Sequence, residues 1–238
     1  MKDKKRTESS YPRIKPVGDC AVLIECGECI SEEVNRRVTG LAARLEEAHL
    51  PGLLKTVPAF ASLLVYYDPL IVDYHTVCKA LENLAAQNQE GKKAGRTVEI
   101  PVCYGGEYGE DLPHVARHAG LSEGEVIRLH SGKSYRIYML GFLPGFPYLG
   151  GLDRRLFTPR LPNPRTKIPA GSVGIGGEQT GIYPMESPGG WQLIGRTPLR
   201  LFHPEDGGKV PYEAGDFIRF VPVSPKEFAE LVKEQKRR

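Results

Sequence analysis

The stretch from Gly141 to Pro198 limits the fold most, because it contains 12 glycines and nine prolines. Proline removes a backbone donor and blocks helix interiors, and glycine favours turns, so a long helix is excluded here. Many short strands joined by glycine and proline turns are typical of a closed barrel or a sandwich. In and around this stretch, the predicted strands are YRIYMLGF, SVGIGG, TGIYP, WQLIG, LRLF and DFIRFVPV.

Within this stretch, GFLPGFPYLGGL (residues 141–152) joins four glycines and two prolines to two phenylalanines and a tyrosine, and carries no charge. The rings could simply fill the core beneath a loop. They could also form the rigid apolar wall of a cleft, because aromatic rings offer wide contact area at low entropic cost. We expect a cleft in the barrel. Its predicted lining comprises Phe142, Phe146 and Tyr148, opposite Gln179, Tyr183, Trp191 and Arg196.

The first hundred residues alternate between helical and strand periodicity. Apolar spacing predicts helices over SEEVNRRVTGLAARLEEAH and DYHTVCKALENLAAQNQ. A turn and a strand are expected over residues 14–26, two short strands around Pro58, and a last strand at RTVEIPVCY. The order β-α-β-β-α-β fits a ferredoxin-like module. We therefore predict an α+β protein, with a ferredoxin-like domain over residues 1–94 and a β-barrel domain over residues 95–238.

Two predicted short helices, EDLPHVARHAG and SEGEVIRLHSG, precede the glycine-rich stretch and resemble a DNA-binding helix-turn-helix. The second helix begins with Ser122, Glu123, Gly124 and Glu125, whose carboxylates phosphate would repel. We therefore expect an ordinary helical hairpin that binds no nucleic acid. A charged helix, SPKEFAELVKEQKRR, is predicted at the C-terminal end.

The composition excludes further classes of function. A hydrophobic share of 40% and a charged share of 26% are ordinary for a globular protein. The net charge of +3 gives no strong field for nucleic acid or anionic lipid. The longest apolar runs are too short to cross a bilayer, and MKDKKRTESS lacks the apolar stretch of a signal peptide. We expect a cytoplasmic protein without a membrane partner.

The cysteines and histidines form no recognisable metal motif. Five cysteines are an odd number and argue against a disulfide framework. CGEC, from Cys26 to Cys29, has CxxC spacing, but no second such pair accompanies it. His114 and His118 are spaced i, i+4, yet no glutamate follows His114. We expect reduced thiols and no metal site.

The stretch PRLPNPRTKIPAGSVGIGGEQTGIYPMESPGGWQLIGRTPLRLF places hydrogen-bonding side chains on glycine-rich β-structure beside the lone tryptophan. This combination indicates a ligand surface. GSVGIGGEQTG breaks the dinucleotide pattern GxGxxG, and HSGKS lacks the first glycine of a phosphate-binding loop. Glycine amides could still bind an anion or a carboxylate. The predicted binding residues are Arg165, Gln179, Thr180, Tyr183 and Trp191, and the predicted anion-binding glycines are Gly174, Gly176 and Gly177.

Three of these motifs, GFLPGFPYLGGL, PAGSVGIGGEQTGIYP and SPGGWQLIGRTP, resemble the signature of the KipI family. This family is also known as the 5-oxoprolinase B-subunit family or as allophanate hydrolase subunit 1-like, with carboxyltransferase subdomains C and D. GDCAVLIECGECISEEVNRRV, SLLVYYDP and VEIPVCYGGEYGEDL fit it too, so the resemblance extends roughly from Tyr11 to Val223. It implies an N-terminal ferredoxin-like domain and a C-terminal cyclophilin-like β-barrel.

The resemblance implies one subunit of a bacterial 5-oxoprolinase, which opens 5-oxo-L-proline to L-glutamate with ATP hydrolysis. Phosphorylation of the lactam oxygen would turn a poor electrophile into a good one, and such a site needs cations and a proton acceptor. His130 as acid or base, and Arg196 or Arg165 as cations, are the expected contributors. The chain has no P-loop, so we expect ATP to bind with or through the A and C subunits of 5-oxoprolinase as partners. The chain alone should be inactive.

Two other functions stay open. Some relatives resemble an inhibitor of a sporulation histidine kinase, and GFLPGFPYLGGL would then dock a protein. The related carboxyltransferase region of urea carboxylase acts on urea, and the sequence does not rank urea against a lactam.

Overall fold

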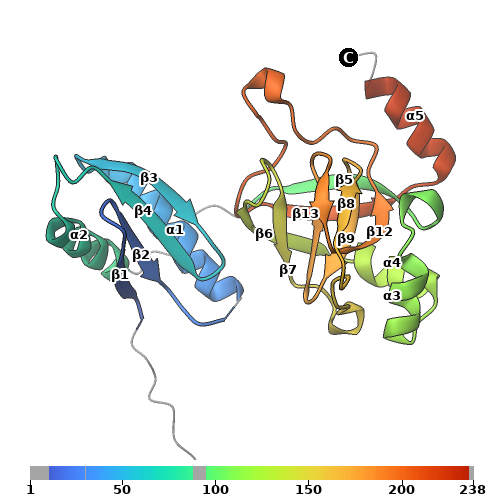
Figure 1. Ribbon diagram of the computed structural model, residues 1–238, viewed down its shortest axis with the longest axis horizontal. Helices are drawn as coiled ribbons and strands as arrows, with labels where there is room; N and C mark the ends of the chain where they lie inside the picture. The colour runs from blue at the N-terminus through green and yellow to red at the C-terminus, as the bar shows by residue number, and fades with distance from the viewer. Residues whose placement is uncertain (1–10, 30, 88–94, 236–238) are drawn as a thin grey trace, which may run out of the picture. The chain divides into compact units, whose positions relative to one another are not determined.

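The chain divides into two compact units, Met1–Lys93 and Ala94–Arg238 (Figure 1). The computed structural model describes residues 11–29, 31–87 and 95–235. Each unit has its own hydrophobic core, and together they make an α+β protein. No helix in the described residues is both long enough and apolar enough to cross a bilayer.

The first unit is a four-stranded antiparallel sheet in the order β1-β2-β4-β3, with two helices against one face. Alternate strand residues such as Ile24 and Leu63 are buried with Val38 of the first helix and Leu81 of the second, because successive strand side chains point to opposite faces. The elements are β1 (Arg13–Val17), β2 (Ala21–Glu25), α1 (Glu32–Ala48), β3 (Leu53–Pro58), β4 (Ser62–Tyr67) and α2 (Tyr74–Ala86).

The predicted order β-α-β-β-α-β is wrong at both ends of the first unit. Arg13–Val17, expected as a turn, is a strand that forms a hairpin with β2. Thr97–Tyr104, expected to complete the sheet, belongs to the second unit as β5, where Ile100 and Val102 are fully buried. The observed order is therefore ββαββα, and the edge position beside β2 is occupied by β1.

The second unit is a closed barrel in the order β10-β7-β6-β13-β5-β12-β9. A separate two-stranded sheet pairs β11 with β8. The strands are β5 (Thr97–Tyr104), β6 (Ser134–Leu140), β7 (Pro147–Gly150), β8 (Arg165–Ile168), β9 (Ser172–Gly176), β10 (Gln179–Ile182), β11 (Ser187–Gly189), β12 (Gln192–Arg196) and β13 (Phe217–Pro222).

Three helices accompany the barrel: α3 (Leu112–Ala119), α4 (Glu123–Ser131) and α5 (Pro225–Gln235). Helices α3 and α4 pack against each other at one side of the barrel and contact β12 and β13 respectively (Figure 1). Short 3-10 turns span Gly106–Tyr108, Arg154–Leu156 and Pro204–Asp206. All five predicted helices are confirmed. Ser31, Asp73 and Ser122 cap three of them through side-chain oxygens that accept a backbone N–H.

The predicted strand LRLF is wrong. The amide of Leu199 donates to the Thr197 hydroxyl (3.2 Å), and the amide of Arg200 donates to the Gln235 side chain (3.0 Å). Neither amide joins a strand ladder, although Leu201 is buried in the barrel core. The apolar side chains of this segment therefore predict its burial correctly, but its backbone is an irregular connection and not a strand.

Candidate functional site

The rings of the 141–152 stretch belong to a cluster of aromatic side chains on the barrel. Phe146 makes edge-to-face contacts with Tyr183 (5.2 Å between centroids) and Trp191 (5.4 Å). Only 1% of Phe146 is exposed, so it is a core residue and not part of the cleft wall that the sequence predicts. Burial also raises the pKa of Tyr183 to about 12.

The glycines beside this cluster make room for Trp191. A Cβ on Gly176 would lie 2.4 Å from the Trp191 ring nitrogen, and a Cβ on Gly181 would lie 3.1 Å from both Phe146 and Trp191. Gly174 and Gly176 lie in β9, which pairs with β10 on one side and β12 on the other. The amide of Gly177 donates to the Thr158 carbonyl (2.8 Å). These backbone groups belong to ladders and turns, so the predicted anion-binding role of Gly174, Gly176 and Gly177 has no support in the geometry.

Above the buried rings lies a surface that we call the aromatic strip, made of Phe142, Tyr148 and Arg160. Phe142 is 64% exposed and has φ of 65°, a left-handed conformation that is uncommon for a residue with a side chain. The amide of Leu143 donates to the Gly141 carbonyl (2.8 Å), which closes a γ-turn around Phe142. The Phe142 ring stands edge-on to Phe146 (5.8 Å). This turn holds an apolar ring out in solvent.

The other two members of the strip rest on the same cluster. Tyr148 is half-buried against Phe146, with 5.0 Å between the ring centroids, and burial raises its pKa. The Arg160 guanidinium lies 5.7 Å from the centre of the Trp191 ring, within cation–π range. Arg160 is exposed. The strip therefore presents a phenylalanine, a tyrosine edge and an arginine on a rigid base.

His130 and Thr180 are joined in the interior of the barrel. The Thr180 hydroxyl donates to the Gly174 carbonyl (3.0 Å), so it accepts from His130 Nε2 (2.8 Å). Nδ1 of His130 then accepts from the Tyr104 hydroxyl (2.8 Å). The histidine is fully buried, and burial lowers its pKa to about 3. A neutral ring with both nitrogens bonded to the core does not support the predicted role of His130 as a catalytic acid or base.

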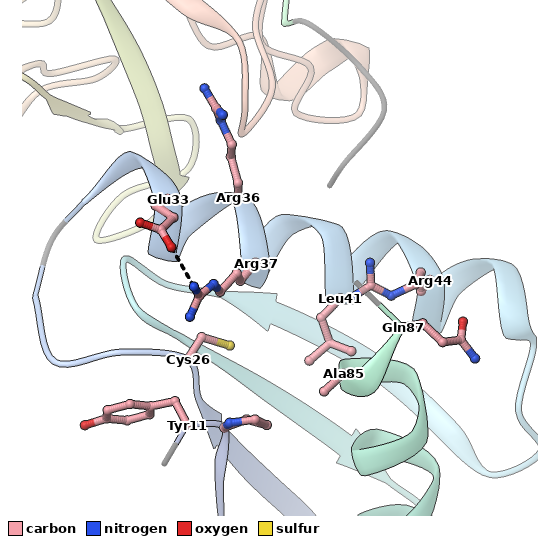
Figure 2. Close-up of a pocket in the computed structure, with 10 residues that line it drawn as sticks. Tyr11, Cys26, Glu33, Arg36, Arg37, Leu41, Arg44, Ala85 and Gln87 are labelled. Carbon is pink, nitrogen blue, oxygen red and sulfur yellow. Dashed lines mark hydrogen bonds and ion pairs between the residues drawn. The ribbon is translucent and has the colours of Figure 1, made fainter. Parts of the chain in front are cut away.

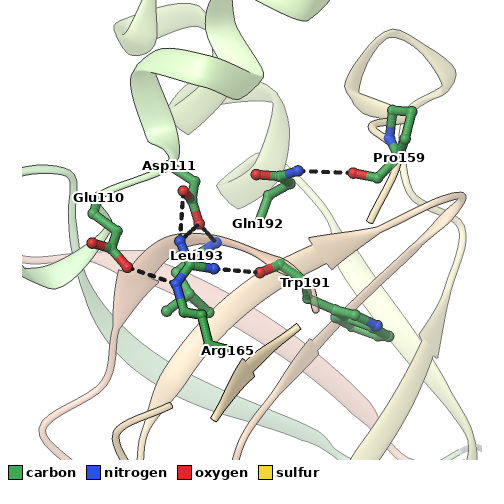
Figure 3. A network of polar contacts seen from close by, with 7 residues as sticks. All are labelled: Glu110, Asp111, Pro159, Arg165, Trp191, Gln192 and Leu193. Carbon is green, nitrogen blue, oxygen red and sulfur yellow. Dashed lines mark hydrogen bonds and ion pairs between the residues drawn. The ribbon is translucent and has the colours of Figure 1, made fainter. Parts of the chain in front are cut away.

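Arg165 is the centre of a polar network that joins α3 to the barrel (Figure 3). Its guanidinium forms ion pairs with Glu110 (2.9 Å) and Asp111 (2.8 Å) and donates to the Trp191 carbonyl (3.3 Å). Asp111 also accepts from the Leu193 amide (2.6 Å). Arg165 is committed to these internal partners, so the expected binding of a substrate anion has no support in its contacts.

Arg196 lies in a different environment from the one predicted. Its guanidinium stacks over Tyr108 (5.1 Å) and over Phe228 of α5 (5.7 Å). The rings that contact Phe146 in the described part of the chain belong to Phe142, Tyr148, Tyr183 and Trp191. The prediction that Arg196 faces Phe146 across a cleft is therefore not supported. Gln179 is half-buried at the start of β10.

The structure thus brings together Phe142, Phe146, Tyr148, Tyr183 and Trp191, and separately His130 with Thr180. Sequence reasoning missed Asp111, whose position before a helix resembles an ordinary cap, and Tyr104, which lies in a strand. Arg160 lies in the polar stretch PRLPNPRTKIP, where the sequence alone gives it no role. Within residues 11–29, 31–87 and 95–235, no three histidine, cysteine, aspartate or glutamate side chains gather as a set of metal ligands.

The chain is a two-domain α+β protein. One domain is an antiparallel sheet covered by helices, and the other is a closed barrel that carries an aromatic surface. The family described as "Carboxyltransferase domain, subdomain C and D" matches residues 12–211, which span most of the first unit and the second unit up to Pro211. The chain belongs to this family.

Relatives support this membership along the whole match. The B subunit of 5-oxoprolinase from Bacillus subtilis (strain 168) is 47% identical over 227 residues, which cover 91% of this chain and 95% of the relative. A crystal structure of a conserved uncharacterized protein from Pyrococcus horikoshii is 52% identical, with a TM-score of 0.55, and the match covers 91% of this chain and 100% of that one. The K. lactis urea amidolyase structure has a TM-score of 0.75 at 22% identity over 94% of this chain and 16% of that one, a likeness of fold.

Proposed function

We propose that this chain is the B subunit of an ATP-dependent 5-oxoprolinase and acts only in the assembled complex. The observation that carries the proposal is the match to the B subunit of the B. subtilis 5-oxoprolinase, which is 47% identical and covers nearly the full length of both chains. The reaction would use one water to open the lactam carbonyl of 5-oxo-L-proline, which breaks the ring C–N bond and gives L-glutamate. A second water would be used in the conversion of ATP to ADP and phosphate. The complex would work in the cytoplasm.

The residues of this chain fit a supporting subunit better than a complete active site. Within the described residues, His130 is neutral in the core and Arg165 is held by two carboxylates. We therefore assign ATP binding and the proton transfers to sites formed with the A and C subunits of the complex. Arg196, stacked on Tyr108 and Phe228, is a candidate cation for such a shared site.

We assign the aromatic strip to the binding of a partner subunit. Exposed aromatic rings and arginines on a rigid base are enriched among residues that dominate protein interfaces. Phe142, held at positive φ above Phe146, has this character, and Arg160 beside Trp191 adds a cation. In fold terms, we assign the barrel to the cyclophilin-like type. We assign the first unit to a variant of the ferredoxin-like type. In this variant, the edge strand β1 is the first strand of the chain.

The test is to co-express this chain with the A and C subunits and to measure 5-oxoproline-dependent ATP hydrolysis and glutamate formation. We expect turnover with all three chains and none when this chain is omitted. Phe142→Ala should weaken assembly, whereas Leu70→Ala, which removes a 94% exposed leucine in the first unit, should not. Full turnover without this chain would contradict the proposal.

Urea is the second candidate substrate, because the fold resembles that of urea amidolyase. Replacing 5-oxoproline with urea in the same assay tests it. Urea-dependent ATP hydrolysis without a response to 5-oxoproline would make urea the favoured substrate and would contradict the proposal of a 5-oxoprolinase.

A further inference from the structure

A cavity of about 660 Å³ lies within the first unit. It is bounded by α1, by the C-terminal end of α2, and by the chain that enters β1 and leaves β2. This volume lies in the range of small-molecule sites. Figure 2 shows Arg37 and Leu41 extending from α1 toward Cys26 and Ala85, whereas Arg36 extends to the other side of the helix.

The wall of the cavity is cationic. Among the described residues, Arg37 and Arg44 contribute guanidinium groups and Glu33 contributes a carboxylate. Arg36 stands at the edge and pairs with Glu32 on the other side of the helix. The Glu33 carboxylate holds Arg37 (2.5 Å). The Leu84 carbonyl accepts from Arg44 Nε (3.1 Å), which ties that side chain to the end of α2. Arg44 is thus held at the wall before any ligand arrives, which lowers the entropic cost of binding, whereas the exposed Arg37–Glu33 pair leaves Arg37 able to turn toward a ligand.

The floor of the cavity is apolar. Leu41 and Cys26 are only 1% and 6% exposed and close the floor from below, and the half-buried Ala85 adds aliphatic surface. Burial raises the pKa of the Cys26 thiol to about 11, although Arg37 and Arg44 act in the opposite direction. The thiol is therefore neutral at physiological pH, and it neither cancels the charge of the wall nor serves as a nucleophile.

We propose that this cavity binds a small molecule that combines an oxyanion with an apolar body. Arg37 and Arg44 would hold the carboxylate or phosphate, and Leu41, Ala85 and Cys26 would contact the apolar part. Guanidinium is suited to this task because its planar fork of N–H donors matches carboxylate and phosphate oxygens. The inference does not depend on the proposed function, because it concerns binding by this chain alone.

Titration calorimetry on the full chain tests the inference with four probes: 5-oxo-L-proline, L-glutamate, ATP and inorganic phosphate. We expect at least one probe to bind with a Kd below about 1 mM, the weak end of ordinary substrate affinities. Arg37→Gln and Arg44→Gln should each weaken that binding about tenfold or more, as expected for the loss of a charge-assisted hydrogen bond. Binding of the first two probes identifies a carboxylate site, and binding of the last two identifies a phosphate site.

Two further variants separate binding from folding. The double variant Glu33→Arg/Arg37→Glu keeps an i, i+4 ion pair on α1 but reverses its direction, so it should lose binding while the unit stays folded. Lys15→Gln removes one positive charge from the Lys15–Glu25 pair on the sheet, outside the cavity, and should bind like the parent. No binding by any probe, or equal binding by the arginine variants and Lys15→Gln, would overturn the inference.

Discussion

Acid should destabilise the barrel through His130. In the folded chain, the ring lies between the hydroxyls of Tyr104 and Thr180, and burial lowers its pKa from 6.5 to about 3. In the unfolded chain, the same histidine has its ordinary pKa near 6.5. As the pH falls below 6.5, the unfolded chain takes up a proton that the folded barrel does not accept. The stabilisation is therefore complete above pH 6.5 and is lost progressively toward pH 3.

The magnitude follows from the linkage between protonation and folding. Between pH 7 and pH 5, protonation of one histidine in the unfolded state alone lowers the free energy of unfolding by about 2 kcal/mol. This loss is large against a typical domain stability of about 5–15 kcal/mol. Carboxylates titrate over the same range, so the prediction concerns the difference between the parent and a variant that lacks His130.

The assay is urea unfolding at pH 7, 6 and 5, followed by the fluorescence of Trp191. Because Trp191 is the only tryptophan and lies in the barrel, the signal reports the second unit. His130→Gln should lose about 2 kcal/mol less than the parent between pH 7 and pH 5. His114→Gln, at an exposed position on α3, should keep the parent's pH dependence.

Equal pH dependence in the parent and in His130→Gln would refute this reasoning. If His130→Gln does not fold, an NMR titration of the His130 ring in the parent decides the question. A ring that takes up a proton above pH 5 in the folded protein would contradict the buried, neutral state and would reopen a catalytic role for His130.

Three further predictions test other parts of the barrel. Gly176→Ala should lower the free energy of unfolding by about 1–3 kcal/mol, because the new methyl group would overlap the Trp191 ring, and urea unfolding with a shift in tryptophan emission would report it. Asp111→Ala should cost about 1–3 kcal/mol in the same assay, because it removes one of the two carboxylates that pair with the partly buried Arg165 and the acceptor of the Leu193 amide. Phe142→Ala should change stability by less than about 0.5 kcal/mol, as for most exposed positions, yet weaken assembly with a partner subunit by about 1–3 kcal/mol in a binding titration.

Local patterns predicted the elements of this protein where burial on one face is strong. Helix α1 follows from Val34, Val38, Leu41 and Leu45 at helical spacing, and these side chains are buried in the first core. The density of glycine and proline after Gly141 led correctly to short strands and a barrel. Both patterns arise because a helix or strand must place its apolar side chains on the side that is covered.

Local sequence patterns do not predict which distant strands pair with each other. Strand β1 is an edge strand with Arg13, Lys15 and Pro16 and little burial, so nothing in its pattern separates it from a turn. Strand β5 has an evident strand pattern, but nothing local says that it pairs with β13 and not with the sheet before it. The element order failed at these two places.

The candidate site shows the same limit. Aromatic residues in the 141–152 stretch and Trp191 were expected to gather, and they do, but whether a ring lies in the core or on the surface depends on the backbone of a single turn. Phe142 and Phe146 are four residues apart in sequence, yet one is exposed and the other is buried. The arginines around the cavity were read only as part of a helix, because the wall opposite them comes from α2 and the chain beside β1.

The parallel pairing of β5 with β13 has a consequence for how the chain is made. Thr97 is in register with Phe217, and Arg96 is bonded to Asp216 across a separation of 120 residues. During synthesis, the sheet of the first unit has all its strands once residue 67 has left the ribosome, whereas β5 and β6 wait for β13 with unpaired edges. Exposed strand edges invite pairing with other chains, and contacts of high sequence separation form slowly. We therefore expect the nascent chain to be most prone to aggregation during translation of its second half, and truncation before Phe217 should leave an aggregating fragment instead of a smaller barrel.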